Sequence, residues 1–101
     1  MTPLQLHQFL LQTRPFTLQT FGGRSDFSFD YLEGDLVIIS SQGVRSIVPK
    51  SIFLAVLSRY NSLSVDLRTI TTQFGNNWPD CPDPHLCPWV GRIIHYFETG
   101  R

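Results

Sequence analysis

Two cysteines and two histidines near the C-terminus are the residues that most readily suggest metal or redox chemistry. They are Cys81, His85, Cys87 and His95. Zinc takes four such ligands, but the spacing C-x3-H-x-C followed by a distant histidine matches no common finger or ribbon. The surrounding prolines also oppose wrapping of the chain around an ion. We therefore expect cysteines that pack as small apolar groups and no bound cofactor, with a zinc site and a Cys81–Cys87 redox pair as open alternatives.

A second group of residues has the chemistry to bind phosphates. It comprises Arg24, Arg45, Lys50 and Arg59, together with the polar side chains of Ser41 and Gln42 at a predicted turn. Arginine contacts phosphate through two parallel hydrogen bonds, and serine and glutamine reach phosphates or base edges. Residues 26–35, by contrast, hold four acids and no base. If the fold keeps this segregation, one face binds nucleic acid, and we favour an accessory or regulatory domain that binds nucleic acid through an arginine-lined hairpin and helix face. Random scatter of charge is the alternative.

Charge content points in another direction. The formal net charge is zero, whereas nucleic-acid-binding domains usually carry a net positive charge. Charged residues make up only 16% of the chain, against about 25% in typical domains. Such a composition fits a chain that hides more of its surface than a free monomer does. The alternative function is therefore a small protein-interaction module, such as an inhibitor, an immunity or anti-defence protein, or an obligate homodimer.

Common enzyme signatures are absent from the sequence. There is no G-x-S-x-G elbow, no phosphate-binding G-x-x-x-x-G-K-S/T loop, no G-x-G-x-x-G fingerprint and no H-E-x-x-H pair. The single lysine, Lys50, has no carboxylate two positions before it, so the metal-binding pattern of restriction-type nucleases is missing too. We expect a non-enzymatic binding protein with no catalytic residues, and a thiol redox protein is the third possibility.

The stretch from Asp35 to Asn61 organises the predicted fold. Four consecutive apolar residues at 36–39 indicate a buried strand, and Gly43 suits a tight turn into a second strand at 44–48. Val44 and Val48 are expected on one face of that strand. Pro49 then favours the start of an amphipathic helix that is capped at Asn61.

The remaining segments are predicted to complete one α+β domain over residues 1–101. An N-terminal helix should begin at Thr2-Pro3 and end at Arg14-Pro15, before strands at about 16–21 and 26–32. Phe27, Phe29 and Tyr31 alternate along the second strand, as a core face or an exposed aromatic platform. With the strands at about 35–40 and 44–48, this predicts a four-stranded antiparallel meander with the N-terminal helix and two to three helices packed on one face.

The C-terminal third is less regular. Residues 63–74 fit a helix or a strand, and we favour the helix. Residues 75–88 are predicted to form a proline-rich loop, and Pro88 is expected in the first turn of a final helix that stops at Gly100. No signal peptide or membrane span is visible, and two cysteines do not make a secreted disulfide framework. We expect a cytoplasmic protein with a nucleic acid or a protein as its partner and no membrane contact.

Overall fold

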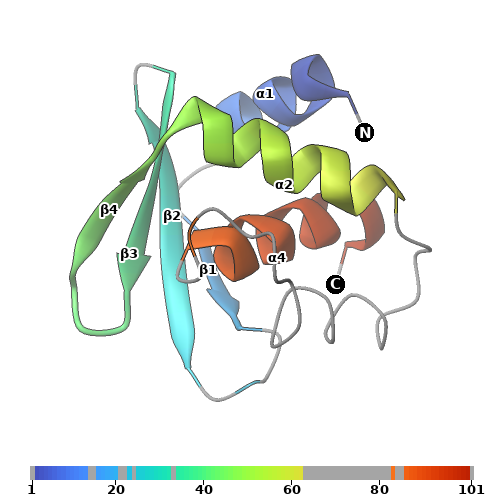
Figure 1. The fold of residues 1–101 in the computed structure, drawn as a ribbon. Coiled ribbons are helices and arrows are strands. Elements are labelled where there is room, and N and C mark those ends of the chain that lie inside the picture. The colour runs from blue at the N-terminus through green and yellow to red at the C-terminus, as the bar shows by residue number, and fades with distance from the viewer. Residues whose placement is uncertain are drawn as a thin grey trace.

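In the described part of the chain, a four-stranded antiparallel sheet forms one layer, and three helices pack on one of its faces (Figure 1). The computed structural model describes residues 2–13, 16–20, 23, 25–32, 34–62, 83 and 86–100. In chain order the elements are α1 (Pro3–Gln12), β1 (Phe16–Gln19), β2 (Asp26–Leu32), β3 (Asp35–Ser40), β4 (Arg45–Val48), α2 (Lys50–Ser62) and α4 (Leu86–Thr99). The strands follow the order β1-β2-β3-β4, so the predicted α+β meander is confirmed.

The register of the sheet fixes which side chains share a face. Phe29 of β2 lies opposite Ile38 of β3, and Leu36 of β3 lies opposite Val48 of β4. These residues face the helices and are at most 4% exposed. Side chains at the alternate positions point to the opposite, outer face. The aromatic stripe is therefore a core face and not a solvent-exposed platform: Phe27 and Phe29 are each 1% exposed, and Tyr31 packs against the same core.

Local sequence signals explain the turns. Gly34 and Gly43 adopt positive φ angles of 85° and 82°, which glycine reaches without steric cost. In the β3–β4 turn, Ser40 N–H donates to the Val44 carbonyl at 2.9 Å, and the Ser40 hydroxyl accepts from the backbone of Gln42. The hairpin that contains the predicted polar residues is therefore closed by its own hydrogen bonds.

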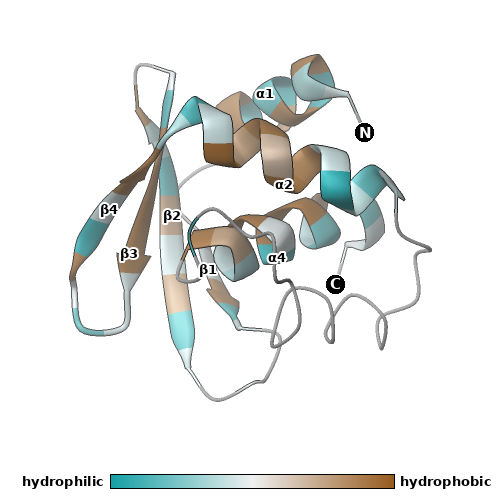
Figure 2. Ribbon diagram, viewed as in Figure 1, coloured by the Kyte–Doolittle hydropathy of each residue, from teal (hydrophilic) through white to brown (hydrophobic). Residues whose placement is uncertain are grey.

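Each helix buries one apolar stripe against the sheet (Figure 2). In α1 a capping box fixes the start, since Thr2 Oγ accepts from Gln5 N–H at 3.1 Å and Gln5 Oε1 accepts from Thr2 N–H at 2.9 Å. Helix α2 follows Pro49, whose carbonyl accepts from the N–H of Phe53. Helix α4 is tied to β1 because Arg92 Nε donates to the Gln19 carbonyl at 3.0 Å.

Several predicted boundaries were wrong. Strand β4 begins at Arg45, because the carbonyl of Val44 already closes the turn, and Val44 is 60% exposed instead of sharing the buried face of Val48. Strand β1 ends at Gln19, short of the predicted residue 21. Helix α2 continues through Asn61 to Ser62, so Asn61 is not its left-handed cap.

Helix α4 begins at Leu86, inside the stretch 75–88 that was predicted to be a loop, and the predicted place of Pro88 in a first helical turn is confirmed. The Asp83 carboxylate accepts from Leu86 N–H at 3.2 Å and so supplies the cap that the prediction had not assigned. Pro88 then occupies the first helical turn, where its missing N–H is tolerated. Predictions for 63–74 fall outside the described residues, as does nearly all of the predicted loop at 75–88. In the described part of the chain, no helix is both long and apolar enough to span a membrane.

Candidate functional site

Part of the predicted phosphate-binding set lies together at the β3–β4 turn. Ser41, Gln42 and Arg45 are all exposed within this one hairpin end. Lys50 is also exposed, but it opens α2 beyond the opposite end of β4, about 15 Å from Arg45 at the usual rise of a strand. Arg59 lies in the last turn of α2, about 13 Å further along the helix axis. The structure thus gathers three of the set at one turn, and Arg24 is outside the described residues.

The outer face of the sheet carries an apolar centre. We call the outer patch the four residues Leu32, Val37, Ile39 and Ile47, which the ladder register places on this face. Val37 is 8% exposed although it is not part of the main core, so its neighbours on the outer face must cover it. Ile47 is 64% exposed and Leu32 is 47% exposed. All three described helices lie on the other side of the sheet and leave this patch uncovered (Figure 1).

The charges around the outer patch are mostly negative. By the same register, Asp26, Asp30 and Asp35 project from β2 and β3 on this face, and Arg45 projects from β4. The strands therefore contribute three carboxylates and one guanidinium to a single surface. Arg45 and the acids, which are separate in the sequence, share one face of the folded chain because strand alternation sets the direction of each side chain.

The two candidate metal or redox residues that the structure describes are both buried. Cys87 is fully buried and disulfide-bonded, whereas Cys81 and His85 lie outside the described residues. His95 is 4% exposed. Among the residues that the structure describes, no three metal-binding side chains gather into a group.

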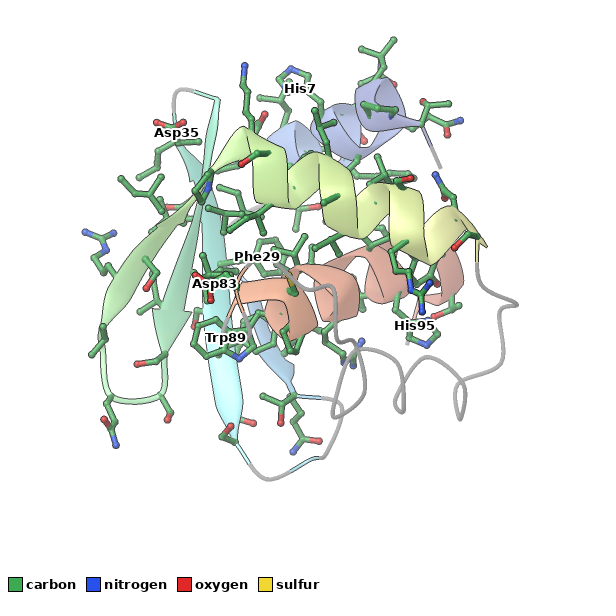
Figure 3. All side chains as sticks on the ribbon, viewed as in Figure 1. His7, Phe29, Asp35, Asp83, Trp89 and His95 are labelled. Carbon is green, nitrogen blue, oxygen red and sulfur yellow. The ribbon has the colours of Figure 1, made fainter. Side chains whose placement is uncertain are left out.

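His95 belongs to a buried polar pair near the end of α2 (Figure 3). Its Nδ1 lies 3.0 Å from the hydroxyl of Tyr60. Burial, followed by the charge of Arg92, lowers the pKa of His95, because both disfavour the imidazolium form. Burial, followed by the charge of Glu98, raises the pKa of Tyr60 to about 12. The pair is therefore neutral at physiological pH and joins α2 to α4.

A further candidate site lies between α1, the β2–β3 turn and the start of α2. It is a cavity of about 470 Å³. Its lining residues are Pro3, Leu4, His7, Tyr31, Gly34, Leu36, Val48, Lys50, Phe53 and Leu54. Leu36 and Val48 are buried and form its floor, whereas Leu4 and Leu54 are 64% and 48% exposed and border its mouth. We call this cavity the α1–α2 pocket.

Two polar side chains of the α1–α2 pocket are hydrogen-bonded to each other. Nδ1 of His7 lies 2.6 Å from the hydroxyl of Tyr31, and the two rings meet edge to face at 5.4 Å. Burial, then the charge of Asp35, raises the pKa of Tyr31, so the phenol keeps its proton. Figure 3 shows His7 and Asp35 at the same end of the molecule. Sequence reasoning missed this site, and its one local signal is that Leu4 and Leu54 are apolar residues outside the buried stripes of their helices.

Comparison with known proteins adds no name to these features. The chain matches no protein-family model, no curated protein and no solved structure. The candidate functional surfaces of the chain are therefore the outer patch, the β3–β4 turn and the α1–α2 pocket.

Proposed function

We propose that this chain is a non-enzymatic protein-interaction module that binds its partner through the outer patch. The observation that carries the proposal is the exposure of Ile47, which is 64% accessible beside the covered Val37 on a sheet face free of described helices. Protein interfaces typically combine an apolar centre with a polar rim. The outer patch has this arrangement, with a polar rim of Asp26, Asp30, Asp35 and Arg45 around it.

The charge of the rim selects the kind of partner. Three carboxylates against one guanidinium make the rim acidic, so a second copy docked face to face would bring like charges together. A partner with apolar side chains ringed by lysine or arginine is complementary. Among the alternatives of inhibitor, immunity protein and homodimer, this charge distribution favours a heterologous protein over self-association through this face.

Replacing Ile47 with lysine is expected to abolish partner capture. The substitution places a solvated cation in the apolar centre and opposes a basic partner, and losses of about tenfold or more are typical at such central positions. Leu11→Lys is the matched control, because Leu11 is 62% exposed on α1, in the helical layer. The measurement is affinity capture from the native host, with each bound protein quantified by mass spectrometry.

The proposal is supported if one protein is captured by the wild type and by Leu11→Lys but not by Ile47→Lys. Equal capture by the two variants would overturn the proposal, and so would the absence of any specifically retained protein. Thermal unfolding of both variants checks that they remain folded, because substitutions at exposed positions usually change stability by less than about 0.5 kcal/mol.

Nucleic-acid binding is the second candidate, and the grouping of Ser41, Gln42 and Arg45 at one exposed turn favours it. Arg24, Lys50 and Arg59 would add further phosphate contacts. We expect a duplex to be retarded at low salt, with affinity that falls steeply as salt rises. Arg45→Glu combined with Lys50→Glu should remove that retardation. A wild-type chain that leaves the duplex unretarded, or a double variant that still retards it fully, rules this candidate out.

The predicted cytoplasmic location and the redox alternative both concern Cys87. Its disulfide argues against a cytoplasmic location, because reducing cytosols keep most protein thiols unpaired. Its complete burial argues against a thiol redox function, since reactive cysteines usually lie in partly exposed positions. Counting free thiols in protein isolated from the host addresses the first point, and a cytoplasmic location predicts two.

A further inference from the structure

The α1–α2 pocket has the size and composition of a small-molecule site. At about 470 Å³ it falls within the range of about 300–1,000 Å³ that is usual for such sites. Its floor of Leu36 and Val48 is buried, and Phe53 continues it as a half-buried wall. These side chains favour a ligand with an apolar body over a strongly hydrated ligand.

The polar groups of the pocket favour an anionic end on that body. Among the described residues that line it, Lys50 is the one that carries a charge, and none of them is a carboxylate. As the first residue of α2, Lys50 also lies at the positive end of the helix dipole, where the first N–H groups have no intrahelical acceptor. A negative group at this point meets both the ammonium and the start of the helix.

The pairing of His7 with Tyr31 supplies a further donor. Because the Tyr31 phenol keeps its proton, it can donate to Nδ1 of His7 across the 2.6 Å contact. In that tautomer the imidazole proton is on Nε2, and the ring presents an N–H at its far edge. The bond holds the ring in one orientation, so less freedom is lost when a ligand accepts from it.

We propose that the α1–α2 pocket binds a small apolar monocarboxylic acid, of which a medium-chain fatty acid is the representative. The carboxylate lies against Lys50 and the first turn of α2, within reach of the His7 ring. The hydrocarbon tail of the ligand lies over Phe53, between Leu4 and Leu54, and covers the exposed surface of these two leucines. This proposal is independent of the proposed function, because none of the pocket residues belongs to the outer patch.

The pocket favours a free acid over an apolar side chain of a partner protein. A leucine or phenylalanine side chain would fill the cavity but carries no negative charge to meet Lys50. The matched pair of ligands for the test is decanoate and decanol, which share a ten-carbon chain and differ in the head group. Decanoate is used below the concentration at which it forms micelles.

The test is a titration of the ¹⁵N-labelled chain followed by amide NMR shifts. Decanoate should bind saturably below about 1 mM and shift Gly34, Lys50 and Leu54 while Gln42 in the β3–β4 turn stays unshifted. Decanol should bind about fivefold more weakly, as expected for loss of one exposed ion pair. Octanoate, shorter by two methylenes, should bind about tenfold more weakly than decanoate.

Two charge-removing variants separate a specific ion pair from general attraction. Lys50→Gln should reduce decanoate affinity about fivefold and leave decanol affinity unchanged. Arg45→Gln removes an equally exposed charge outside the pocket and should leave both unchanged. The proposal is overturned if decanoate produces no saturable shift, if decanol binds as well as decanoate, or if the two variants behave alike. Shifts confined to the outer patch would overturn it as well.

Discussion

Phe29→Ala is expected to lower the free energy of unfolding by about 3–5 kcal/mol, the usual cost of truncating a buried phenylalanine. The Phe29 side chain is 1% exposed at the centre of β2, and its ring meets Phe97 of α4 edge to face at 6.1 Å. Alanine would leave a cavity between sheet and helix that rigid neighbours fill only in part. Since small domains are stable by about 5–15 kcal/mol in total, this one change removes much of the margin.

Phe9→Ala is the matched control for Phe29→Ala. The Phe9 ring also contacts Phe97, stacking at 5.3 Å, but its side chain is 41% exposed on α1. We expect it to cost about 1 kcal/mol, which is the contribution of one aromatic pair. Urea unfolding followed by circular dichroism gives both values. Equal costs for the two variants would contradict the assignment of Phe29 to the core, and Phe29→Leu provides a milder change if the alanine variant does not fold.

The sheet could be predicted from the sequence because its signals are local. Alternation at Phe27 and Phe29 identifies β2, and the apolar run at 36–39 identifies β3. The glycine at position 43 marks the turn between β3 and β4. Each of these signals lies within the element that it predicts, and no distant residue has to be known. The start of β4 and the end of the predicted loop at 75–88 were wrong because turn and capping hydrogen bonds decided them.

The α1–α2 pocket could not be predicted in the same way, because its parts come from three separate segments. His7 and Tyr31 are 24 positions apart and meet only when α1 packs beside β2. The charge pattern shows the same limit. Asp30 and Arg45 belong to oppositely charged stretches of sequence, yet strand alternation directs both to the outer face. Which residues share a surface depends on register and packing, whereas the sequence shows only their order along the chain.

Stability is expected to fall as the pH drops below 6.5, and His95 should account for much of the change. Its pKa in the folded chain is lowered from 6.5 by burial and by the charge of Arg92, so the unfolded chain takes up the proton first. The free energy of unfolding therefore decreases from about pH 6.5 down to the lowered pKa, by at most about 1.4 kcal/mol per pH unit. Well above pH 6.5 both states are neutral at this site and no dependence remains.

The groups packed around His95 support this direction. From α2, the Tyr60 hydroxyl lies 3.0 Å from Nδ1, and with its pKa at about 12 it offers no negative charge to stabilise an imidazolium. On α4 itself, Arg92 opposes protonation. Among the described residues, Glu98 is an acid whose charge reaches the pair, and it acts on Tyr60. Burial and the guanidinium therefore outweigh any stabilisation of the protonated ring.

His95→Gln should flatten the pH dependence of stability between about pH 5 and 7, even if glutamine lowers stability overall. His7→Gln is the control, since His7 is a half-buried histidine on α1, far from this pair in the sequence. Urea unfolding of the wild type and both variants across this range gives the slopes. If His95→Gln keeps the wild-type slope, the neutral Tyr60–His95 pair does not account for the acid sensitivity.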